Sequence, residues 1–263
     1  MEQSKRNRII TQGLGVLLIG LLVQGTGWLK GNSLVFPGVG EILRAFFALL
    51  GKGQTYRLIG TTVLHLAEAL ALSSLAGIAL GLLEGVWDFA HELLTPLMTL
   101  LRSIPMVVLA VVIMVLTKYE RVPLIATSLI LIPLISEAVC EGCRAIPQEL
   151  LDVYRLNSPL NLTVVRLVYL PMMAGYLRQA YVSAVGMGVK MVVSTEYLVQ
   201  TRDSLGKAIH NSIYFNDYQD IYAYVLLIAL VVLLLGRLPA ALISLNEKHK
   251  KTSPTGRSSR ARR

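Results

Sequence analysis

Long apolar stretches alternate with short polar segments along most of this chain. Six of the stretches are long enough for membrane-spanning helices, because about 20 apolar residues cross a hydrocarbon core of about 30 Å. We predict the spans at residues 9–29, 57–86, 92–116, 122–143, 172–199 and 220–245. The pattern therefore predicts an all-α, polytopic membrane protein with about six transmembrane helices.

The composition also agrees with a polytopic membrane protein. Hydrophobic residues make up 54% of the 263 residues, charged residues only 16%, and the mean hydropathy is +0.60. We expect residues 1–8 to be a cytoplasmic N-terminus and residues 9–245 to be one transmembrane domain. The basic segment 246–263, rich in Ser and Arg from Thr252 onward, is expected to be a disordered cytoplasmic tail.

Lysine and arginine set the expected orientation. They are in excess in residues 1–8, between the fourth and fifth spans and in the basic tail. The positive-inside rule then puts both termini in the cytoplasm of a multi-pass protein in a bacterial plasma (inner) membrane. The net charge of +9 is interpreted as a topology and lipid-surface signal, and we expect no nucleic-acid partner.

Small residues and prolines predict where helices pack closely and where a membrane-spanning helix is interrupted. Gly77, Gly81 and Gly85 recur every fourth residue in the second span and predict close helix packing. Arg102 and Pro105 interrupt the third span. A proline frees backbone carbonyls that only neighbouring helices or a wet cavity can satisfy, so a solute pathway is expected beside this break.

A polar segment at residues 147–163 separates the fourth and fifth spans. Its helical periodicity places apolar Leu151 and Tyr154 beside the charged Glu149, Asp152 and Arg155. Such a helix could lie on the membrane surface and dock into a soluble partner. The alternative is a solvated amphipathic loop.

Cys140 and Cys143 are the only cysteines and stand one helical turn apart. We interpret them as a reduced structural pair. A metal site would need further ligands that neighbouring residues do not supply, so none is predicted.

Several of these residues match a known family. Pro96 followed by Leu101-Arg102-Ser103-Ile104-Pro105, and Asp152 followed by Leu170-Pro171, resemble the permeases of nitrate, sulfonate, taurine and thiamine-precursor ABC importers. The resemblance covers roughly residues 60–245. The chain departs from the family pattern where Val153 and Tyr154 replace two alanines and Asn157 replaces a glycine.

The resemblance implies a type I ABC importer permease without catalytic residues. It implies an ABC ATPase dimer that carries ATP and Mg, a second permease subunit in a homodimer or heterodimer, and an extracytoplasmic solute-binding protein. This chain itself would bind no cofactor. The segment 147–163 would be the coupling helix, with its ATPase contacts at Glu149, Leu151, Asp152, Tyr154, Arg155 and Asn157.

The predicted pathway residues are Arg102, Pro105, Met187 and Lys190, and the expected solute is small and polar or anionic. Lys190 could face the pathway or pair internally with Glu196 or Glu137.

Two other classes of membrane protein were weighed. A secondary carrier would show internal repeats, which the sequence lacks. A membrane-embedded enzyme would need clustered catalytic residues, but the histidines are scattered and no HExxH motif occurs. A Walker A motif is also absent, so ATP hydrolysis is assigned to a partner chain.

Overall fold

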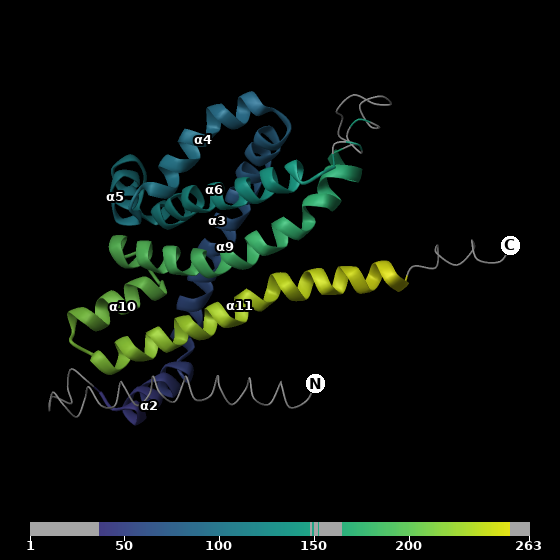
Figure 1. The fold of residues 1–263 in the computed structure, drawn as a ribbon. Coiled ribbons are helices and arrows are strands. Elements are labelled where there is room, and N and C mark those ends of the chain that lie inside the picture. Colours follow the sequence, from purple (N-terminus) through teal and green to yellow (C-terminus); the bar gives the residue numbers. More distant parts are fainter. Residues whose placement is uncertain (1–36, 148, 150–151, 153–164, 253–263) are drawn as a thin grey trace.

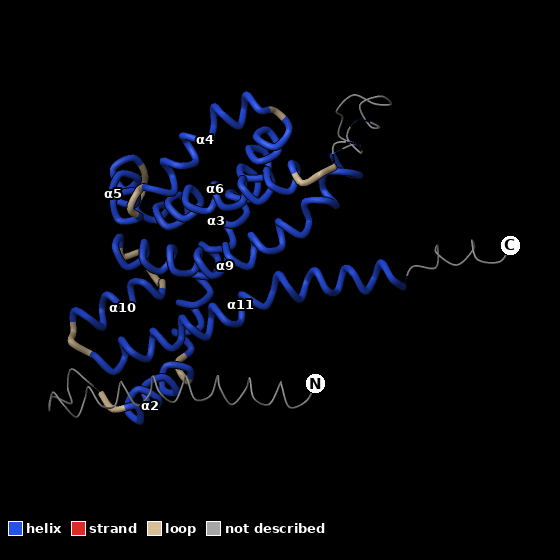
Figure 2. The backbone as a smooth tube through the Cα atoms, viewed as in Figure 1, coloured by secondary structure: helices blue, strands red, loops and turns tan. Residues whose placement is uncertain are grey.

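The computed structural model of the protein describes residues 37–147, 149, 152 and 165–252, and every regular element in that part is helical (Figures 1 and 2). The elements are α2 (Val39–Leu50), α3 (Gly53–Val86), α4 (Asp88–Ser103), α5 (Met106–Leu116), the 3-10 turn η1 (Tyr119–Arg121), α6 (Val122–Arg144), the π-helical turn η2 (Val165–Tyr169), α9 (Leu170–Val199), α10 (Leu205–Tyr214) and α11 (Tyr218–Thr252).

Four of the described helices are long and apolar enough to cross a membrane. They are α3, α6 together with η1, α9, and α11 over Tyr218–Gly236. These helices match four of the predicted spans. The predicted span at residues 9–29 lies outside the described part of the chain.

The third predicted span, 92–116, is not one helix. It consists of α4 and α5, which meet at an angle of 100°. Ile104 leaves the helical region, with φ −69° and ψ 124°, immediately before Pro105. Proline has no N–H to donate and disfavours a helical conformation in the residue before it, so the backbone turns there.

The centre of the bundle is formed by α3, α6 and α9, and α3 runs across the other two (Figure 1). Gly77, Gly81 and Gly85 of α3 lie directly against α6. A Cβ atom on Gly77 would lie 2.9 Å from the Cβ of Ile135, and one on Gly85 would lie 2.5 Å from the Cβ of Cys143. Only glycine allows the two backbones to come this close.

The contact between α6 and α9 has the same character, although the sequence did not single it out. A Cβ on Gly142 would lie 2.5 Å from the Cβ of Met173. Cys143, Met173 and Tyr169 are buried together in the same cluster. Cys140 and Cys143 are both buried free thiols.

The remaining helices pack at the other end of α9. The amphipathic helix α2 buries Leu49 in one cluster with Leu66, Leu205 and Leu227. The ten-residue helix α10 was not predicted, because it is short and bordered by charged residues. Finally, α11 continues beyond the boundary predicted at residue 245 to Thr252, since Lys and Glu favour helix.

Candidate functional site

An ion pair between α4 and α6 lies at the centre of the candidate site. The guanidinium of Arg102 lies 2.8 Å from the carboxylate of Glu137 and donates a second hydrogen bond of 2.9 Å to the carbonyl of Pro133. The two charged side chains are 43% and 48% exposed. A half-exposed pair inside an apolar bundle needs water or a polar neighbour, so this face of the bundle is not expected to meet lipid.

Three adjoining cavities open around the pair. One of about 370 Å³ lies between α4, α6 and α9 and is lined by Ile104, Met106 and Met187. A second, of about 420 Å³, lies between the ends of α3, α4 and α6, and a third, of about 180 Å³, lies between α6 and α9. Glu137 lines all three, and Arg102 lines the first two. The three cavities therefore adjoin one another at Glu137, and together we call them the groove.

One face of α9 lines part of the groove, and all of its side chains except Met187 are polar. This face, the α9 stripe, consists of Tyr176, Gln179, Ser183, Met187, Lys190 and Ser194. The spacing of three and four residues puts all six on the same side of the helix, and all six are exposed. Apolar residues would be expected on a face that meets lipid, so a polar stripe indicates a different neighbour.

Lys190 has no hydrogen-bonding or ionic partner among the described residues. Both carboxylates considered for it are occupied elsewhere, because Glu137 pairs with Arg102 and Glu196 pairs with His65. Among the described residues, Lys190 therefore forms neither of the two internal pairs considered for it.

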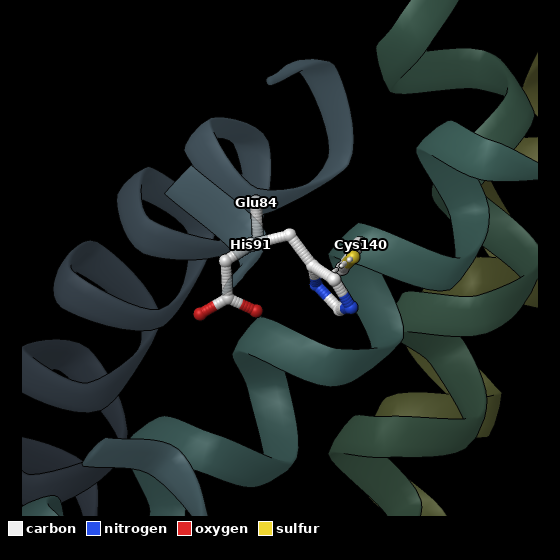
Figure 3. Close-up of side chains that lie close together, drawn as sticks. All are labelled: Glu84, His91 and Cys140. Carbon is white, nitrogen blue, oxygen red and sulfur yellow. Dashed lines mark hydrogen bonds between the residues drawn. The ribbon is translucent and has the colours of Figure 1, made fainter. Parts of the chain in front are cut away.

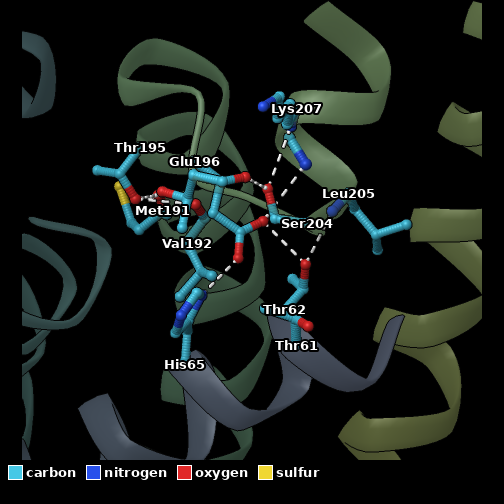
Figure 4. A network of polar contacts seen from close by, with 12 residues as sticks. Thr61, Thr62, His65, Met191, Val192, Thr195, Glu196, Ser204, Leu205 and Lys207 are labelled. Atoms are coloured by element: carbon cyan, nitrogen blue, oxygen red, sulfur yellow. Dashed lines mark hydrogen bonds and ion pairs between the residues drawn. The ribbon is translucent and has the colours of Figure 1, made fainter. Parts of the chain in front are cut away.

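Glu196 belongs to a separate network that joins α3, α9 and α10 (Figure 4). It is fully buried. Its Oε2 accepts hydrogen bonds of 2.8 Å from the Thr62 hydroxyl and 3.3 Å from the backbone N–H of Gly206, and its Oε1 lies 2.8 Å from Nδ1 of His65. A buried carboxylate is tolerable only with such complete satisfaction.

The same network also caps α10. The first three backbone N–H groups of this helix, which have no acceptor within it, reach Thr62, Glu196 and Ser204 respectively. A negative charge at a helix N-terminus is additionally stabilised by the helix dipole. The network is therefore structural, and sequence reasoning missed it because its members are up to 143 positions apart.

In the sequence, the residues predicted to contact an ATPase follow α6 and precede α9. Glu149 and Asp152 have helical backbones and exposed side chains. Leu151, Tyr154, Arg155 and Asn157 lie outside the described residues. Of the pathway residues, Arg102 and Met187 line the groove, Pro105 forms the bend beside it, and Lys190 lies on the α9 stripe.

Residues 73–251 match the family described as binding-protein-dependent transport system inner membrane component. The chain belongs to this family. It is 22% identical over 232 residues to a probable ABC transporter permease protein of Brucella melitensis, which covers 86% of this chain and 93% of the relative. A probable ABC transporter permease protein of Brucella abortus is also 22% identical, with 86% and 92% covered.

The fold is also that of a solved transporter. A structure titled as an inward-facing conformation of the MetNI methionine ABC transporter superposes with a TM-score of 0.61 at 17% identity, covering 76% of this chain and 96% of that one. The prediction of a type I ABC importer permease fold is confirmed. This permease is a non-catalytic, multi-pass membrane subunit, which excludes the secondary carrier and the membrane enzyme.

Proposed function

We propose that this permease forms one wall of the solute pathway of an ABC importer, along the groove around Arg102 and Glu137. The single observation that carries the proposal is that four residues of the α9 stripe line cavities of the groove, namely Tyr176, Gln179, Ser183 and Met187. Together the groove and the stripe supply a wet, charged surface in a bundle that is otherwise apolar. A membrane protein without a polar pathway would have no reason to keep these groups there.

A second permease subunit would cover the other side of the pathway, facing the α9 stripe. Two subunits are needed because each chain has one coupling segment whereas an ATPase dimer offers two clefts. The partner is a second copy of this chain or a related permease. Both termini would lie in the cytoplasm of a bacterial inner membrane, with a solute-binding protein docking on the opposite side.

Lys190 gives the pathway its proposed preference. Its ammonium group is exposed and unpaired within the described part of the chain, next to Met187 on the same face. An unneutralised cation there would attract an anionic or strongly polar small solute. Selection among such solutes would remain with the solute-binding protein.

Coupling would run through residues 147–163, with ATP and Mg bound by the partner ATPase. The segment follows α6, which carries Glu137, and it precedes η2 and α9, which carries Lys190. A rigid-body movement of the segment by the ATPase would therefore reach both walls of the groove with few intervening residues.

The proposal is tested with Glu137→Gln, which removes the charge of the central pair but keeps the shape of the side chain. We expect uptake into proteoliposomes carrying the assembled transporter to fall about tenfold or more, which is the scale of losing about 1.4 kcal/mol. ATPase copurification should be unchanged.

Glu92→Gln is the matched control, because Glu92 is an exposed carboxylate on α4 that does not line the groove. It should transport at the wild-type rate. Wild-type uptake by Glu137→Gln would show that the solute passes elsewhere, and failure of the chain to copurify with any ATPase would remove the coupling proposal.

A further inference from the structure

Three potential metal ligands meet at one end of the bundle. Glu84 lies in the last turn of α3, His91 in the first turn of α4, and Cys140 near the end of α6 (Figure 3). One ligand atom from each lies within 4.8 Å of the other two. The sequence predicted no metal site, because only the fold brings these residues to Cys140.

The spacing suits a tetrahedral ion. Zinc binds thiolate sulfur at about 2.3 Å and imidazole nitrogen at about 2.0–2.1 Å, which separates the two ligand atoms by roughly 3.5 Å. Sγ of Cys140 and Nδ1 of His91 are 3.8 Å apart. Small rotations of the Cys140 and His91 side chains would bring these two atoms to the distance that zinc requires. A rotation of the Glu84 side chain would likewise bring its carboxylate within reach of the ion.

Glu84 supplies an independent indication of a ligand. Glu84 is only 5% exposed, and in the described part of the chain its Oε1 atom has no hydrogen bond of good geometry; the neighbouring Ser136 hydroxyl interacts with the carboxyl group but is itself left without a well-aligned partner. A buried carboxylate oxygen without a partner is unfavourable. A cation shared with His91 and Cys140 would satisfy it.

The charges around the cluster also favour a cation. All three residues line the 420 Å³ cavity, together with the carboxylates of Glu137 and Glu141. The two guanidinium groups lining it are each paired with an acidic side chain, Arg102 with Glu137 at 2.8 Å and Arg144 with Asp88 at 2.9 Å. Among the described residues that line this cavity, three carboxylates therefore face two guanidinium groups, and one of those guanidinium groups is also engaged by Asp88.

We propose that Glu84, His91 and Cys140 form a binding site for Zn²⁺ or a similar borderline-soft divalent cation, with a water molecule from the cavity as the fourth ligand. The mixture of thiolate, imidazole and carboxylate disfavours Mg²⁺ and Ca²⁺, which prefer oxygen ligands alone. The ion would tie the corner between α3 and α4 to α6, one turn from Glu137.

The site is tested with Co²⁺, which substitutes for Zn²⁺ and reports its own ligands by absorption. Purified full-length chain, freed of metal by a chelator, is titrated with Co²⁺ and then with Zn²⁺. We expect one tetrahedral Co²⁺ per chain with a thiolate charge-transfer band that Zn²⁺ abolishes. Cys140→Ser should lose the band, and His91→Ala should bind at least about 100-fold more weakly, since loss of an outer-shell partner alone costs 10–100-fold.

Cys143→Ser is the matched control, because Cys143 is also buried but packs against Gly85 rather than in the cluster. It should keep the band. Absence of a thiolate band in the wild type, or equal loss in Cys143→Ser, would overturn the proposal. If Cys140→Ser does not fold, His91→Ala decides alone by equilibrium dialysis with Zn²⁺, and unchanged binding in that variant would overturn it too. None of these measurements depends on solute transport.

Discussion

Replacing Gly81 by alanine should destabilise the bundle, although alanine normally favours a helix. A Cβ atom on Gly81 would meet the backbone oxygen of Ser136 and lie 2.7 Å from the Cβ of Val139. Both neighbours are fixed by the helix α6, so α3 and α6 must move apart. Overpacking of this kind costs typically about 1–3 kcal/mol, and the rigid neighbours favour the upper end.

Gly60→Ala is the control on the same helix. Apart from the adjoining residues of the helix itself, no atom lies within 4 Å of the position that its Cβ would take, so only the helix preference of alanine remains. That preference is worth about 0.5–1 kcal/mol and should stabilise α3. The same gain applies to Gly81→Ala and cancels in the comparison. The two variants should therefore differ in free energy of unfolding by the overpacking cost alone, about 3 kcal/mol.

The measurement is thermal unfolding of the purified chain in detergent. For a domain of this size, about 1 kcal/mol corresponds to roughly 2–4 °C, so Gly81→Ala should melt about 6–12 °C below Gly60→Ala. If Gly81→Ala melts at or above the wild-type temperature, the close approach of α3 and α6 is not a feature of the folded protein. The reasoning also fails if both variants fall equally.

Three further predictions follow from the other sites. Glu196→Ala should lower the free energy of unfolding by about 3–5 kcal/mol, because it leaves His65 and the N–H of Gly206 without their acceptor. Glu196→Gln should lower it by less, and denaturation in detergent measures the free energy of unfolding of both variants. Asp152→Arg or Tyr154→Arg should separate ATP hydrolysis from transport or dissociate the ATPase while membrane insertion is kept, and normal uptake in both variants would refute the coupling assignment. Lys190→Met should reduce the transport rate of an anionic or polar solute without altering assembly with the ATPase, and an unchanged rate would show that Lys190 lies off the pathway.

The long helices were predictable because their length and apolarity are local properties. The second span was expected at 57–86, and α3 runs over Gly53–Val86. Pro105 was correctly expected to interrupt the third span. The angle of 100° was not predictable, because it depends on how α4 and α5 pack against α6 rather than on the proline alone.

The candidate sites were predictable only in part, for the same reason. Arg102 and Met187 were expected beside a pathway, and both line the groove. Their partner Glu137 was noted only as an alternative neighbour of Lys190, since side chains 35 positions apart show no common pattern in the sequence. Glu84 and His91 were likewise not linked to Cys140.

The capping of α10 has a consequence for how this part of the protein could be altered. The helix is joined to α9 by residues 200–204, and it is also held by Glu196 and Thr62, which belong to α9 and α3. The covalent connection to α9 is thus not what alone holds the start of α10 in place. A chain break or an insertion between Gln200 and Asp203 should leave α10 packed against α3 and α9. A single substitution at Glu196 should weaken this packing although the chain remains intact.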